Sequence, residues 1–377
     1  TSLPNRTFWF APNGKPNGDG SKEHPFRGSV PVFEAVCRKF GGGHTYMFKP
    51  GFYKGQLEIP KGCNGTKERP TILKSQVKWK AVVYGAKGWG LFSPCDWVII
   101  DGFEVCTTLG TGITVSGKYA TVRNCHVHHN TLQGIGAGTG SIIENNLIEF
   151  NGSHVHFHHG VYAGGDGLIV RNNIVRHNSG YGLHLYDNVS NAVVVNNVVY
   201  GHSTRAGIVV ACSEGGGTNV VANNTIARNK VGIMFFNGNG DVIVNNILWE
   251  NGTPFSNVTE KLLIEHNLCW PQFNIEKGEH DIEADPRFVA EGDYVFWLRK
   301  NSPCIGKGSL KYASETDFWG RPRKKDQPVD LGAFSYRPFL EKKSAREGWH
   351  SGWPYRFARK GGSNWKGGQP DLWWLPE

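Results

Sequence analysis

A glycine-initiated segment recurs six times between about residue 97 and residue 255, and this repetition restricts the folds open to the chain. Each copy alternates apolar with variable residues: Gly-Ile-Thr-Val (112–115), Gly-Ile-Gly-Ala (134–137), Gly-Val-Tyr-Ala (160–163), Gly-Leu-His-Leu (182–185), Gly-Ile-Val-Val (207–210) and Gly-Ile-Met-Phe (232–235). After a short turn comes a second segment, which ends in Asn-Asn in five of the six copies. The glycines lie about 22 to 26 residues apart, the length of one coil of a solenoid.

The alternation has a period of two, which predicts strands with residues such as Ile113 and Val115 pointing into a core. No two-residue hairpin turn joins the strands, and the same strand type returns in every coil, so the strands should stack in parallel. Leucines at fixed offsets, which a leucine-rich repeat needs, are missing. We therefore predict an all-β fold, a single-stranded right-handed parallel β-helix.

An asparagine recurs at the end of each second segment, where the chain should turn a corner. Asparagine tolerates left-handed backbone, and its amide can hydrogen-bond to an equivalent amide in the next coil. We expect stacked corner residues that bond to the coil above. They are Asn124, Asn145, Asn172, Asn196, Asn223 and Asn245.

The two ends of the chain carry a family resemblance. Residues 8–60, with Phe8-Trp-Phe-Ala-Pro-Asn-Gly and Phe48-Lys-Pro-Gly-Phe-Tyr, resemble the opening coils and cap of secreted, carbohydrate-active β-helix proteins that are polysaccharide lyase-like. Residues 285–334 resemble their closing segment. We expect residues 1–336 to form the β-helix with its N-terminal cap and the Trp-, Gly- and Lys/Arg-rich tail 337–377 to pack along it. Lyases, glycosidases, epimerases and binding proteins share this scaffold, so the resemblance leaves the reaction open.

The net charge and the cysteine content indicate which classes of binding partner the protein can have. The formal net charge of +9 and the pI near 9.1 favour a polyanionic partner through long-range attraction. The basic residues form no continuous stripe, so we expect an acidic polysaccharide and no nucleic acid. No apolar run reaches the roughly 20 residues needed to span a bilayer, and no membrane partner is expected. Eight cysteines without a CxxC pair argue against a zinc ribbon. We expect a secreted or periplasmic monomer.

The outward-facing positions of the glycine-initiated strands predict where chemistry occurs. The residue two after each glycine runs Thr114, Gly136, Tyr162, His184, Val209 and Met234. Tyr162 and His184 should then be neighbours about 4.8 Å apart, the spacing of paired strands. Arg205 enters from the preceding turn. We predict these three as the catalytic group, with substrate-binding residues at His158, His159, Tyr186, Asp187 and Lys230.

Such a group suits β-elimination on a uronate-containing polymer. A cation such as Arg205 neutralises the carboxylate, and histidine and tyrosine supply the base and the acid. Hydrolysis instead needs two carboxyl groups about 5 to 9.5 Å apart. The candidates for that alternative are Asp187, Asp166 and Glu214, with Glu149 outward on another face. A third reading is a non-catalytic glycan-binding module with Trp89, Trp97, Trp249 and Trp270 as platforms.

The stretch Ser153-His-Val-His-Phe-His-His-Gly160 is unusual for its histidines. His154, His156 and His158 would share one side of an extended strand, as metal ligands can. No nearby Cys, Asp or Glu completes a ligand set, and we expect no metal site there. A calcium ion (Ca²⁺), which some lyases of this architecture use, is the alternative cofactor, but no aspartate cluster stands out to hold it.

Overall fold

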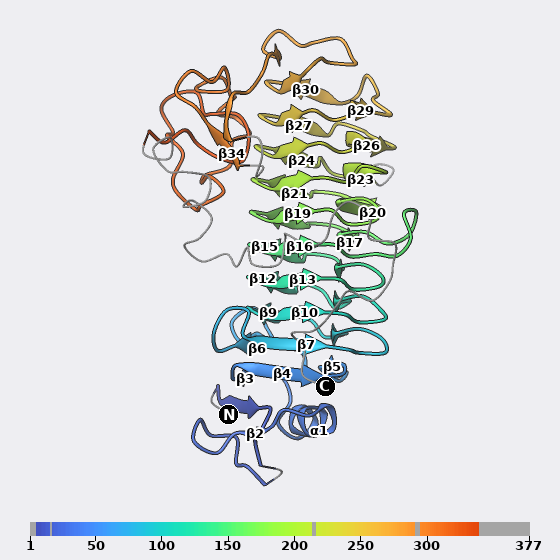
Figure 1. The fold of residues 1–377 in the computed structure, drawn as a ribbon, viewed down its shortest axis with the longest axis vertical. Helices are drawn as coiled ribbons and strands as arrows, with labels where there is room; N and C mark the ends of the chain where they lie inside the picture. The colour runs from blue at the N-terminus through green and yellow to red at the C-terminus, as the bar shows by residue number, and fades with distance from the viewer. Residues whose placement is uncertain (1–4, 16, 213–215, 291–294, 339–377) are drawn as a thin grey trace.

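The computed structural model describes residues 5–15, 17–212, 216–290 and 295–338, and it confirms the right-handed parallel β-helix (Figure 1). Each coil contributes one strand to each of three parallel sheets, which we call sheets A, B and C. The sequence patterns marked the strands of sheets C and A. The strands of sheet B, which in the repeat begin two residues after each corner asparagine, were missed because most are three-residue segments without a glycine before them.

Within the described residues, sheet A has 12 strands, sheet B has 11 and sheet C has nine. In spatial order, sheet A contains β2 (Phe26–Arg27), β1 (Thr7–Ala11), β3 (Thr45–Phe48), β6 (Thr71–Ser75), β9 (Val98–Asp101), β12 (Thr121–Arg123), β15 (Ile142–Glu144), β18 (Ile169–Arg171), β21 (Val193–Val195), β24 (Val220–Ala222), β27 (Val242–Val244) and β30 (Leu263–Glu265). Sheet B contains β32 (Ile282–Glu283), β31 (Leu268–Trp270), β28 (Ile247–Trp249), β25 (Thr225–Ala227), β22 (Val198–Tyr200), β19 (Ile174–Arg176), β16 (Leu147–Glu149), β13 (His126–His128), β10 (Glu104–Cys106), β7 (Ala81–Tyr84) and β4 (Gly51–Lys54). Sheet C contains β29 (Thr253–Ser256), β26 (Val231–Phe236), β23 (Ala206–Cys212), β20 (Leu183–Val189), β17 (Val161–Ala163), β14 (Ile135–Ala137), β11 (Ile113–Val115), β8 (Leu91–Ser93) and β5 (Leu57–Glu58).

The inward side chains form one continuous apolar core along the axis. Ile113 and Val115 are fully buried in it, as the alternation predicted. At the N-terminal end, the helix α1 (Val30–Phe40) closes the core with Phe33, Val36 and Cys37. The open end of a solenoid exposes an apolar cross-section, so a cap of this kind is required for solubility.

A buried row of asparagines runs along the inside of the corner between sheets A and B. Its members are Asn146, Asn173, Asn197, Asn224, Asn246 and Asn267. Each Nδ2 donates to the Oδ1 of the next member at 3.0 Å, and each Oδ1 also accepts the backbone N–H of the residue one coil earlier. The row therefore pairs buried polar groups of neighbouring coils along this corner.

The predicted corner asparagines do adopt left-handed backbone, with φ between 54° and 61°. The prediction that their side chains bond to a neighbouring coil holds for Asn124, whose Nδ2 donates to Asp101 at 2.8 Å, and is wrong for four others. Four of them donate to backbone carbonyls of residues 309–330, far along the chain: Asn172, Asn196, Asn223 and Asn245. The second asparagine of each Asn-Asn pair makes the ladder instead.

The segment from about residue 285 to 338 lies beside the upper coils and does not continue them (Figure 1). It contains an antiparallel pair, β33 (Phe288–Ala290) and β34 (Val295–Leu298). Phe296, Trp297 and Leu298 pack with outward residues of sheet B such as Tyr200 and Trp249 in a second apolar cluster. Almost the whole predicted tail, residues 339–377, lies outside the described residues.

All eight cysteines are buried thiols, so neither Cys106 nor Cys125 is bridged. In the part of the chain that the structure describes, no helix has the length and apolar character needed to cross a membrane.

Replacing Asn224 with Ala should destabilise the fold by about 2–4 kcal/mol, because the change leaves several buried backbone and side-chain groups of adjacent coils unpaired. Urea unfolding monitored by circular dichroism measures the loss. The exposed Asn239→Ala is the matched control and should change the free energy of unfolding by less than about 0.5 kcal/mol. If both substitutions changed the free energy of unfolding equally, the asparagine row would not be a determinant of stability.

His202 takes an asparagine position in a second buried row, where it lies between Asn178 and Asn229. Burial lowers its pKa to about 3, so the unfolded chain binds the proton first as the pH falls below about 6.5. Above that pH the ring is neutral in both states and the free energy of unfolding is unaffected by its protonation. Below that pH the unfolded chain gains a proton that the folded protein does not, so the free energy of unfolding falls until about pH 3. His202→Asn should therefore reduce the fall in unfolding free energy by about 1.4 kcal/mol per pH unit between pH 6 and 4. Parallel stability–pH curves for the two proteins would contradict this.

Candidate active site on sheet C

Tyr162 and His184 are neighbours on the outer face of sheet C, as predicted. The parallel register pairs Tyr162 of β17 with His184 of β20, and pairs His184 in turn with Val209 of β23. The tyrosine and histidine rings meet edge to face with their centroids 5.3 Å apart. Tyr186, two residues further along β20, lies 5.2 Å from the His184 ring. Both tyrosines are more than a third exposed, so their hydroxyl-bearing rings form the surface of the site.

His159 and Tyr181 form the inner wall of this aromatic group. His159 is buried, and its ring contacts His184 edge to face at a centroid distance of 4.4 Å. The backbone N–H of Tyr181 donates to His159 Nδ1 at 3.2 Å, and the Tyr181 ring lies 4.7 Å from that of His184. His184 is thus held by rings on several sides, which fixes its orientation.

Arg205 lies at the edge of the group and not at its centre. Its guanidinium stacks over the Tyr181 ring at 5.8 Å. Nε donates to the backbone carbonyl of Val155 at 3.1 Å, and Nη2 contacts the ring of His156. These contacts join the histidine-rich turn to the site and hold the cation one ring away from His184.

The remaining predicted residues occupy the rim. Lys230 is exposed, and its backbone N–H donates to carbonyls of His202 and Arg205. Asp187 is also exposed and directly follows Tyr186. His158 is half-buried, and its Nδ1 is within hydrogen-bonding distance of the Ser153 hydroxyl, so it faces the turn. The structure therefore brings Tyr162, His184, His159 and Tyr186 together. The three rim residues do not contact the His184 ring.

The electrostatic environment favours a neutral imidazole. Desolvation lowers the pKa of His184 to about 4. Its buried Nδ1 has no hydrogen-bond partner among the described residues. Burial raises the pKa of Tyr162, with smaller contributions from Tyr186 and Asp187. At neutral pH the site thus presents a neutral base beside a protonated phenol.

The carboxyl groups considered for hydrolysis are mostly engaged elsewhere. Glu149 is on the outside of sheet B, where His126 and Arg176 bind its two oxygens at 2.9 and 2.5 Å. Burial alone would raise the pKa of Glu149, but these two partners lower it below its usual range. Asp166 accepts hydrogen bonds from Ser190 and Asn191 of the next coil. Glu214 lies outside the described residues.

A second polar group was missed by the sequence reasoning. Glu104 and Cys106 of β10 and His126 and His128 of β13 form neighbouring pairs on the outer face of sheet B. The signal was present, because both segments alternate polar residues around an inward valine. It went unread because the strands of sheet B were not recognised.

Comparison with known proteins supports the fold. The family model described as "Right handed beta helix region" matches residues 83–216. Pectate lyase L of Thermoclostridium stercorarium is 26% identical over 133 residues, which are 34% of this chain and 10% of that protein. The crystal structure of pectate lyase Pel9A superposes with a TM-score of 0.61 at 17% identity, covering 89% of this chain and 97% of that one. An alginate lyase from Paenibacillus sp. str. FPU-7 superposes with a TM-score of 0.54 at 14% identity, covering 74% and 99%.

The His184 ring should titrate near pH 4, well below the 6.5 of a free imidazole, because its surroundings are desolvated. Histidine NMR resonances followed from pH 3 to 8 measure this, and the resonance missing in His184→Gln identifies the residue. A midpoint near 6.5 would mean that the ring is solvated and that the aromatic group does not enclose it.

Proposed function

We propose that this protein is a carbohydrate-active enzyme, a polysaccharide lyase that cleaves a uronate-containing polymer by β-elimination. The observation that carries the proposal is the contact between a neutral histidine and a protonated tyrosine on the outer face of a β-helix sheet. The named relatives, two pectate lyases and an alginate lyase, support the same class of substrate. The net charge of +9 supports an anionic polymer.

In this proposal His184 is the base and Tyr162 the acid. The imidazole takes the C5 proton of the uronate, the C–H electron pair forms the C4–C5 double bond, and the C4–O bond breaks. Tyr162 gives its proton to the departing glycosidic oxygen. The two rings are close enough to act on adjacent atoms of one sugar.

Arg205 supplies the cation for the uronate carboxylate, where negative charge develops during proton removal. Its guanidinium contacts Val155 and His156 and lies over the Tyr181 ring, which in turn contacts His184. In this proposal the exposed Tyr186, Asp187 and Lys230 orient the chain of sugars around this centre. The buried His159 acts through its contact with the His184 ring, and the half-buried His158 faces the histidine-rich turn.

The substrate also tunes the base. A pKa of about 4 makes the free imidazole a weak acceptor, although it keeps the ring neutral at pH 7. A bound uronate places a negative charge beside the ring, and an opposite charge raises the pKa of an imidazole. Binding of the correct, anionic sugar would therefore strengthen the base, whereas a neutral sugar would not.

A glycoside hydrolase is the second candidate, and the exposed Asp187 beside Tyr186 is the observation that favours it. Its acid and base would be carboxyl groups. The lyase and the hydrolase are told apart by product, because only elimination leaves an unsaturated sugar.

The purified protein should release a product absorbing in the ultraviolet from a polyuronate and none from a neutral glycan. His184→Gln should lower kcat by about 100-fold or more, and Tyr162→Phe by a similar factor, since each removes a proton-transfer group. Tyr119→Phe, a change at an exposed tyrosine on another part of the helix, is the matched control and should leave kcat unchanged.

Circular dichroism of all variants verifies that the fold is retained. Reducing ends without ultraviolet absorbance would replace the lyase with the hydrolase. Full activity of His184→Gln would remove the assigned base, and binding of the polymer without any product would make the protein a glycan-binding module.

A further inference from the structure

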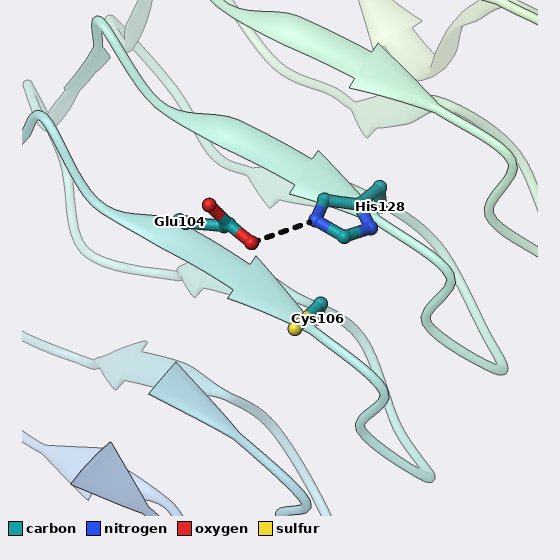
Figure 2. A group of neighbouring side chains, drawn as sticks. All are labelled: Glu104, Cys106 and His128. Carbon is teal, nitrogen blue, oxygen red and sulfur yellow. Dashed lines mark hydrogen bonds and ion pairs between the residues drawn. The ribbon is translucent and has the colours of Figure 1, made fainter. Parts of the chain in front are cut away.

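We propose that Glu104, Cys106 and His128 form a binding site for a divalent transition-metal ion of the zinc type, on the face of sheet B. Figure 2 shows the three side chains converging from two adjacent strands, with Glu104 and Cys106 on β10 and His128 on β13. This site is independent of the carbohydrate chemistry on sheet C and uses none of its residues.

The parallel register creates the convergence. Cys106 pairs with His128 across the two strands, and Glu104 is two residues before Cys106 on the same face. One ligand atom from each side chain lies within 4.8 Å of the other two. Glu104 Oε1 and His128 Nε2 are 3.3 Å apart, which is about the separation of an oxygen and a nitrogen bound tetrahedrally to one zinc ion.

The donor set selects the class of metal. A thiolate, an imidazole and a carboxylate together favour Zn²⁺ or a similar ion over calcium or magnesium, which bind oxygen. Binding would release the thiol proton of Cys106 to solvent, because the thiolate is the ligand. Three protein ligands leave a fourth position for water.

Further contacts hold the proposed ligands in place. His128 Nδ1 lies 2.8 Å from His129 Nδ1, so the nitrogen remote from Glu104 is already hydrogen-bonded. Metal-ligating histidines are usually oriented in this way through their second nitrogen. Cys106 and His128 are buried, whereas the Glu104 side chain is 17% exposed, which gives an ion a route from solvent.

The test is metal retention by the full chain. Each protein is dialysed against Zn²⁺ and then passed through gel filtration. The zinc content of the wild-type protein should exceed that of Cys106→Ser or His128→Gln by about one ion per chain. Cys269→Ser removes another buried thiol of sheet B and is the matched control, which should keep the wild-type amount. Atomic absorption measures the content, and circular dichroism verifies the fold of each variant.

Cobalt(II) gives a second readout, whose first step uses the wild-type protein alone. Wild-type protein loaded with Co²⁺ should show a thiolate-to-cobalt charge-transfer band, and this band should be absent in Cys106→Ser and present in Cys269→Ser. If wild-type protein shows no such band, or if Cys106→Ser and His128→Gln retain as much zinc as the wild type, the three residues form only a buried ion pair beside a thiol and the proposal is wrong.

Discussion

The structure depends on the pairing of polar groups inside the corners of a narrow solenoid. A coil of about 22 to 26 residues must turn its backbone repeatedly within an apolar interior, and each turn brings N–H and C=O groups away from water. The row that includes Asn146, Asn173 and Asn197 supplies the missing partners, because each amide bonds both to the next amide and to backbone. A coil shifted by one residue would lose these bonds along the whole row, so the row fixes the register of all three sheets.

Because the register between coils is fixed, outward side chains of successive short strands are aligned and can form one surface. Each outward side chain lies about 4.8 Å from its equivalent in the next coil, and the chain needs no long loop to bring distant residues together. Tyr162 and His184 are 22 residues apart in sequence and in ring contact. The same rule brings Cys106 beside His128 on another sheet. Two unrelated groups of chemistry can therefore occupy two faces of one coil stack.

The repeat allowed the fold and the sheet C neighbours to be predicted, because period-two alternation directly gives the direction of each side chain. The partner of each corner asparagine could not be predicted. Asn172 and Asn196 bond to residues 316–318, and contacts with so distant a segment leave no local pattern. The position of Arg205 was likewise only approximate, since a turn residue follows no strand register and its guanidinium contacts Val155 and His156.

The two polar faces differ in where their negative charge comes from. On sheet B, His126 and His128 each lie beside a glutamate of the protein, at 2.9 and 3.3 Å, so the carboxylate of each pair comes from the chain itself. On sheet C, desolvation lowers the pKa of His184, and within the described part of the chain no carboxylate contributes to the shift. Under the proposed function, the anion that this neutral imidazole lacks would come from the substrate, which fits a chain of net charge +9. The proposal therefore separates a uronate polymer from a neutral glycan, because only the former would supply the charge that raises the basicity of the ring.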